Sequence, residues 1–205
     1  MKRVNLDVFV TGLVLAAGAS RRLGEPKQLL AYKGTTVLGA TLEMARSCGF
    51  DQLLVTVGGA WAEVGHRVDF RDCHVVENEQ YASGCSSSIG AAIAVVDDRA
   101  EGIVLLLGDQ PDVTTAAVAK LIEGAGTSPL AVCRYGDGVG HPFWFRRQVF
   151  DDLLGLHGDK AVWKLLESDR SRVREVVIDG NIPLDVDTWQ DYQAMLTAAG
   201  GEPGG

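Results

Sequence analysis

Short apolar runs recur along the chain at intervals that are typical of strands separated by helices. Residues 104–107 are apolar without interruption, a pattern that favours a strand covered on both of its faces. Runs of this kind predict seven strands, at residues 8–17, 52–58, 73–77, 102–108, 129–135, 141–146 and 172–178.

Several segments between these runs carry apolar residues at helical spacing. Leu38, Leu42 and Ala45 fall on one side of a helix, and the segment 115–125 repeats the pattern. Alternation of strand and helix predicts an α/β fold with a mostly parallel sheet flanked by helices. The runs at 129–135 and 141–146 are separated only by "GDGVG", which predicts a hairpin and therefore a mixed sheet.

Length and composition fit one globular domain over residues 1–205. The chain has 205 residues, of which 46% are hydrophobic and 22% charged. We expect a core over about residues 8–199, and a flexible tail over 200–205 because "GGEPGG" has no apolar periodicity.

The net charge and the spacing of the cysteines limit the classes of binding partner and the cellular compartment that we expect. A net charge of −8 argues against a nucleic-acid or anionic-membrane partner, and no apolar run approaches the ~18 residues of a membrane span. The N-terminus superficially resembles a signal peptide, but Asn5, Asp7 and Thr11 interrupt its apolar stretch, which favours a buried first strand. The cysteines are far apart, without a CxxC pair, which predicts reduced thiols in a cytoplasmic protein.

The loop after the first strand combines small and basic residues. In "GASRRLGEPK", closely approaching amides suit an anion, and Arg22 and Lys27 suit the charge of a transferred phosphoryl group. The loop matches neither a Walker motif nor GxGxxG. A solvated turn with two surface arginines is the structural alternative. Because ligands of parallel sheets bind beyond the carboxyl ends of strands, we expect a site here.

Two further loops follow predicted strands. Gly84 and the serines 86–88 precede a helical run, where they cap the helix or bind an anion. Asp109 in "LLLGDQPDV" is either a ligand of Mg²⁺ or a turn residue that caps the helix near Thr114.

The remaining polar candidates have simple structural interpretations. Asp187 or Thr188 caps the final helix, with a second metal carboxylate as the alternative for Asp187. Asp159 is expected to start a helix, and a lone histidine such as His141 is more often structural than catalytic.

Six blocks together resemble one family. They are "LVLAAGASRRLGEPKQLL", "YASGCSSSIGAAI", "GDQPDV", "GHPFWF", "GDKAVWKLL" and "DVDTWQDY". They resemble nucleotidyltransferases with the MobA-like NTP transferase fold over about residues 10 to 193. The closest likeness is to the molybdenum cofactor cytidylyltransferase branch, since "AAG" and "DQP" are typical of it, whereas guanylyl-transferring relatives more often show "AGG". The resemblance implies a three-layer α/β/α Rossmann-like nucleotidyltransferase fold.

The resemblance also implies roles for individual residues. Arg22 and Lys27 would be catalytic, Asp109 and Asp187 would hold Mg²⁺, and His141 would face the acceptor. The implied nucleotide-binding residues are Leu15, Ala16, Ala17, Gly18, Ala19, Ser20, Arg21, Arg22, Lys27, Gly84, Ser86, Ser87 and Asp109.

Two positions depart from the family pattern. Tyr81 stands where relatives often have Trp, and "DTWQDY" replaces the commoner "DTPED". The second departure removes a helix proline and puts the metal role of Asp187 in question.

The implied reaction is one-step transfer of a nucleotidyl group. A phosphate of the acceptor, which the resemblance implies is molybdopterin, attacks the α-phosphorus of the NTP, preferably CTP over GTP, and pyrophosphate leaves. Three alternatives stay open: another phosphorylated acceptor, an NAD(P)-dependent oxidoreductase, and a non-catalytic nucleotide-binding chaperone for a molybdoenzyme. The missing glycine fingerprint counts against the oxidoreductase.

Overall fold

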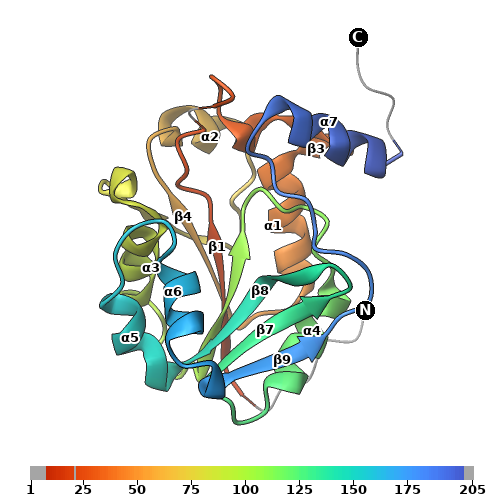
Figure 1. The fold of residues 1–205 in the computed structure, drawn as a ribbon. Helices are drawn as coiled ribbons and strands as arrows, with labels where there is room; N and C mark the ends of the chain where they lie inside the picture. The colour runs from red at the N-terminus through yellow and green to blue at the C-terminus, as the bar shows by residue number, and fades with distance from the viewer. Residues whose placement is uncertain (1–7, 21, 201–205) are drawn as a thin grey trace.

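A computed structural model describes residues 8–20 and 22–200 of the chain, which form a seven-stranded sheet between two layers of helices (Figure 1). The strands follow the spatial order β5-β4-β1-β6-β8-β7-β9. Their bounds are β1 Val10–Leu15, β4 Gln52–Val57, β5 His74–Glu77, β6 Gly102–Leu107, β7 Leu130–Tyr135, β8 Gly138–Arg146 and β9 Val173–Val177.

The sheet is mixed, as the sequence predicts. β8 runs antiparallel to both of its neighbours, β6 and β7, and the other strands of the sheet run parallel to one another. β7 and β8 form the predicted hairpin around Gly136 and Asp137. All seven predicted strands are present.

Helices cover both faces of the sheet (Figure 1), which confirms the three-layer α/β/α fold. One face packs against α1 (Val37–Ser47), α2 (Trp61–Arg67) and α4 (Thr115–Ala125). The other packs against α3 (Cys85–Ile93), α5 (Phe150–Leu154) and α6 (Ala161–Ser168). The last helix, α7 (Trp189–Ala198), packs in a third cluster with Leu23, Tyr32 and Val37.

The central strand β6 shows why this sequence forms a buried sheet. Its side chains alternate between the layers: Val104 and Leu106 join the core under α1 and α4, and Ile103 and Leu105 join the core under α3 and α5. None of the four is more than 1% exposed. An uninterrupted apolar run is therefore required for two-sided burial.

Short elements escaped the sequence analysis because they are too brief to show a period. These are α2, α5, the hairpin of β2 (Ala31–Tyr32) and β3 (Thr35–Thr36), and the 3₁₀ turns Lys27–Leu29, Tyr81–Ser83, Arg147–Val149 and Arg170–Arg172. In the seven residues of α2 the one buried side chain is Val64.

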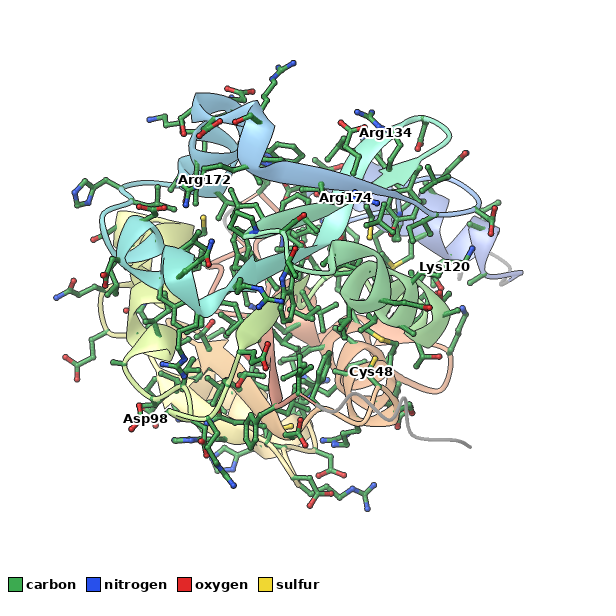
Figure 2. The ribbon with its side chains drawn as sticks, turned by 90° about the horizontal axis from the view of Figure 1, so that it is seen from below. Cys48, Asp98, Lys120, Arg134, Arg172 and Arg174 are labelled. Carbon is green, nitrogen blue, oxygen red and sulfur yellow. The ribbon has the colours of Figure 1, made fainter. Side chains whose placement is uncertain are left out.

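The two ends of the sheet differ in what they carry. Figure 2 looks from below at the amino ends of the parallel strands, with Asp98 in the turn before β6 and Arg172 directly before β9. The loops that the sequence analysis selects lie at the opposite end.

Cys48, Cys73, Cys85 and Cys133 are all free thiols, as their spacing predicts.

No helix in the described part of the chain is both long and apolar enough to span a bilayer. Residues 1–7 of the N-terminus, and the predicted tail beyond Gly200, lie outside the described residues.

Candidate functional site

A cavity of about 280 Å³ opens beyond the carboxyl ends of β1 and β6. These strands are hydrogen-bonded neighbours with Leu15 paired to Leu107, so the loops that follow them meet. The first loop, the start of α3, and the segments around Asp109 and Asp187 contribute to its lining. The structure thus brings together four segments that are far apart in the sequence.

The floor of the cavity needs a glycine. Gly108 N–H donates to the carbonyl oxygen of Leu15 at 2.9 Å, and a Cβ on Gly108 would lie 2.9 Å from that same oxygen. The close approach of the two strand ends therefore places Asp109 directly beside the first loop.

A buried glutamine that the sequence analysis missed fixes the shape of the first loop. Gln28 is 3% exposed, and its Nε2 donates to the carbonyl oxygens of Ala16 at 2.8 Å and Gly18 at 2.9 Å. The Ser20 hydroxyl donates to Gln28 Oε1 at 3.3 Å and accepts from the backbone N–H of Lys27 at 2.9 Å. The one sequence feature that could have indicated a role for Gln28 is its position as a polar residue directly before the apolar pair Leu29–Leu30.

Leu15, Ala16, Ala17 and Gly18 line the cavity, and their role in binding a nucleotide stays a prediction. Ala19 and Ser20 instead line a wider opening of about 610 Å³ that adjoins it. Arg21 lies outside the described residues.

Lys27 joins the two carboxylates that the sequence analysis treated as metal ligands. Its Nζ lies 2.5 Å from Asp109 Oδ2 and 2.9 Å from Asp187 Oδ1. The side chains of Lys27 and Asp109 are 16% and 12% exposed, whereas that of Asp187 is 51% exposed. Arg22 contacts the other oxygen of Asp187 at 3.2 Å, on the solvent side.

The buried pair has shifted protonation equilibria. Burial lowers the pKa of Lys27, but the carboxylates of Asp109 and Asp187 raise it more, so the net pKa lies above the ordinary value and the ammonium stays charged. Burial raises the pKa of Asp109, the Lys27 ammonium opposes that rise, and the nearby Asp185 adds to it. An Asp109 carboxylate without a cation beside it would be costly in this place.

Asp109 does not cap a helix. The cap of α4 is Thr114, whose side chain accepts from the N–H of Ala117 at 3.1 Å. The helix-capping part of that alternative is therefore wrong: Asp109 lies in a turn, but its carboxylate is directed to Lys27.

Asp187 is likewise free of a capping role. Thr188 is the N-cap of α7 and forms a capping box with Asp191. The Asp191 carboxylate also accepts from the N–H of Asp187 at 3.2 Å, which fixes the backbone there. Despite Trp189 at the position after the cap, the Asp187 side chain reaches Lys27 and Arg22.

Across the cavity from the first loop, a second wall forms where the residues before α6 pack against the start of α3. Gly84, at φ 103°, is the N-cap of α3, and a Cβ there would lie 2.7 Å from the carbonyl carbon of Gly158. Asp159 Oδ1 accepts from the N–H of Cys85 at 3.2 Å, and Ser86 Oγ accepts from the N–H of Gly158 at 2.9 Å. The expectation that Asp159 starts its own helix is wrong: its carboxylate accepts from the first N–H of α3, and α6 begins at Ala161 after its N-cap, Lys160.

The serines after Gly84 do not cap α3, contrary to expectation, because they lie inside its first turn. Ser86 and Ser87 do not line the main cavity. The Ser87 hydroxyl accepts from Asn78 Nδ2 at 2.8 Å, and Ser88, which does line the cavity, accepts from the same amide at 2.9 Å.

His141 lies apart from this cavity's lining, on β8. Its ring centroid is 4.0 Å from that of Phe143 and 6.5 Å from that of Trp163. Burial lowers its pKa to about 3, so the imidazole is neutral at physiological pH. An acceptor-side role for His141 stays a prediction.

The two connected cavities differ in charge. Asp109, Asp159, Asp185 and Asp187 line the inner one, together with Lys27. The outer one adds Arg22 and Lys160. A ligand with anionic phosphates in the outer cavity and an accompanying cation in the inner cavity would complement the charges of both.

The carboxylates fit a divalent cation only in part. Among the described residues there is no group of three or more His, Cys, Asp or Glu side chains that could hold a metal ion. Asp109 and Asp187 nevertheless converge on one cation, the Lys27 ammonium, which stands in for a metal ion between them. Two carboxylates completed by substrate phosphates are a usual arrangement for Mg²⁺.

Comparison with known proteins gives a consistent answer. The family described as "MobA-like NTP transferase domain" matches residues 12–174. The chain is 31% identical to the purine catabolism protein PucB of Bacillus subtilis (strain 168), over 93% of this chain and 97% of that protein. It is 26% identical to the molybdenum cofactor cytidylyltransferase of Escherichia coli (strain K12), over 88% of this chain and 92% of that protein.

A solved structure is more similar still. Rv0371c from Mycobacterium tuberculosis H37Rv has 54% sequence identity and a TM-score of 0.87, covering 93% of this chain and 98% of that chain. The same protein has been solved in complex with manganese, with 51% identity and a TM-score of 0.83, covering 93% of this chain and 100% of that chain.

Proposed function

The chain belongs to the MobA-like NTP transferase domain family, and from this premise we propose that it transfers a nucleotidyl group from CTP to a phosphorylated pterin of the molybdopterin type. The observation that carries the proposal is the inner cavity, where Ala16 to Gly18 and the charged residues Lys27 and Asp109 line one space. That space adjoins an opening lined by Arg22 and Lys160.

Each part of the site would have a separate task. The backbone of residues 15–18, fixed by Gln28, would bind the base and ribose, since a rigid loop positions hydrogen-bonding groups accurately. Lys27 and Arg22 would neutralise charge on the phosphates as the bond to the leaving pyrophosphate breaks. The acceptor phosphate is already anionic at neutral pH, so the reaction needs no general base.

Asp109 and Asp187 would hold Mg²⁺, with phosphate oxygens completing the coordination. When bound, the ion would neutralise charge on the reacting phosphates. Support for a divalent ion comes from the manganese complex of the 51% identical protein and from the convergence of both carboxylates on one cation.

The choice of CTP and of the pterin rests on the "AAG" and "GDQP" blocks and on the likeness to the Escherichia coli cytidylyltransferase. PucB shows that relatives of similar length carry other assignments, so the acceptor must be tested directly.

The test is pyrophosphate release with Mg²⁺, each of CTP, GTP and ATP in turn, and purified molybdopterin as acceptor. We expect release with CTP that depends on the acceptor. Tighter binding or faster release with GTP would refute the choice of CTP. Release with a phosphosugar but not with the pterin would refute the acceptor and keep the transferase.

A further inference from the structure

The cation site of the inner cavity is already filled by the protein itself. Lys27 Nζ bridges Asp109 Oδ2 at 2.5 Å and Asp187 Oδ1 at 2.9 Å. A single ammonium group therefore contacts the carboxylates from both the end of β6 and the segment before α7.

The charge of the inner cavity explains why an internal cation belongs there. Of its lining residues in the described part of the chain, four are aspartates and one, Lys27, is a cation. Asp109 has only 12% of its side chain exposed, so water cannot replace the ammonium as its partner without a large solvation penalty. Lys27 thus stabilises the site when no ligand is bound.

Lys27 lies at the boundary between the inner and the outer cavity. It also lines the outer cavity, together with Arg22 and Lys160, where anionic phosphates would lie. Its backbone N–H is fixed to Ser20 at 2.9 Å, and the side chain beyond it has four rotatable bonds with staggered alternatives.

We propose that Lys27 is the internal counter-cation of the carboxylate pair, and that it competes with a divalent metal ion for Asp109 and Asp187 until nucleotide phosphates draw it away. The inference rests on the proposed nucleotidyltransferase function. A metal ion bound to both carboxylates at about 2.1 Å would occupy the space that the ammonium fills. Metal and nucleotide then bind as one unit, and metal alone binds weakly.

The experiment measures Mn²⁺ binding to the full chain by the electron paramagnetic resonance signal of free Mn²⁺, with and without a non-hydrolysable CTP analogue. The wild-type protein should bind Mn²⁺ weakly alone and at least about tenfold more tightly with the analogue, since removal of a nearby like charge changes ion affinity by this order. Lys27→Met keeps the aliphatic stem and removes the charge. It should bind Mn²⁺ without nucleotide at least about tenfold more tightly than wild type.

Two controls isolate the position of the charge. Lys33→Met removes a lysine that pairs with Asp112 at 2.9 Å on the surface, and it should leave Mn²⁺ binding unchanged. Asp109→Asn should abolish the gain in the Lys27→Met background. If Lys27→Met does not fold, Lys27→Gln provides a neutral side chain that can still donate a hydrogen bond to Asp109.

The outcomes separate this proposal from the proposed function. A folded Lys27 variant that binds Mn²⁺ no more tightly than wild type overturns the competition, and so does wild-type protein that binds Mn²⁺ equally well with and without nucleotide. Absence of any nucleotide binding would instead refute the transferase. The comparison of metal affinities without nucleotide would still decide the role of Lys27.

Discussion

The two walls of the cavity are built in opposite ways. The first-loop wall, residues 15–28, is one continuous segment shaped by a buried side chain, Gln28, and it carries the cations Lys27 and Arg22. The α3 wall joins residues 84–88 to residues 158–160, and it depends on close backbone packing at Gly84. One wall is specified by local sequence and carries the cations Lys27 and Arg22, whereas the other, with Asp159 and Lys160, exists only because two distant segments dock.

This difference predicts that changes of charge beside the first-loop wall reduce transfer at nearly constant stability. Changes of shape in the α3 wall should reduce stability first. Four substitutions test the contrast.

The largest effect is expected from Asp109→Asn on the cavity floor. It keeps the size of the side chain but removes the charge that contacts Lys27. Removal of one group that stabilises transition-state charge typically costs about 100-fold or more in rate. Metal-dependent pyrophosphate release should fall by that order, with the melting temperature within a few degrees of wild type. Asp112→Asn, which changes a surface pair, is the matched control. Full activity in Asp109→Asn would remove Asp109 from the site.

Gly84→Ala should be the most destabilising change in the α3 wall. The new Cβ would lie 2.7 Å from the backbone of Gly158, at a φ of 103° that disfavours any side chain. Strain and overpacking together should cost about 3 kcal/mol. Thermal and urea unfolding measure the loss.

Gly158→Ala is the control for backbone strain alone. Its φ is 84°, and a Cβ there meets nothing within 4 Å. A left-handed conformation costs roughly 1–2 kcal/mol in an alanine. Equal losses for both variants would show that the docking of Gly84 against Gly158 adds nothing.

Gln28→Leu should affect both properties moderately. It leaves the carbonyl oxygens of Ala16 and Gly18 without their donor, which should cost about 1–3 kcal/mol. Because the loop loses its fixed shape, affinity for CTP should fall as well. Isothermal titration calorimetry checks the affinity. Unchanged CTP affinity with reduced stability would assign Gln28 to folding alone.

The smallest effect is expected from Lys160→Ala. Within the described part of the chain, this lysine is the one cation that the α3 wall contributes to the outer cavity. Because the side chain is exposed, affinity for CTP should fall only a few-fold. Affinity for CMP, which lacks the outer phosphates, should not change. Lys164→Ala, one turn further along α6, is the control, and equal effects of the two variants would contradict a specific contact by Lys160.

Much of the fold was predictable because burial on two faces leaves a local trace. Ile103 to Leu106 form an unbroken apolar run, and Thr114 and Thr188 stand at the starts of α4 and α7, where a hydroxyl can accept from the backbone. Such features depend on neighbours within a few residues. By contrast, α5 has five residues, too few to show a helical period.

The candidate site was predictable in its parts and not in its connections. Sequence indicated Lys27, Asp109 and Asp187 separately, and it assigned the lysine to phosphate and the aspartates to metal. The tertiary structure joins all three in one ion-pair cluster. It also assigns Asp159 to the start of α3, 74 residues away in the chain.

Local patterns in the sequence were therefore enough to predict which strands are buried, about where α4 and α7 begin, and which loop carries the basic residues. The pairs of charges that neutralise one another, and the glycines that let two backbones touch, became evident from the three-dimensional arrangement alone. The difference arises from the separation along the chain over which each kind of interaction acts. Periodicity and capping act over a few residues, whereas ion pairing and close packing depend on strand order and on the docking of segments that no local pattern records.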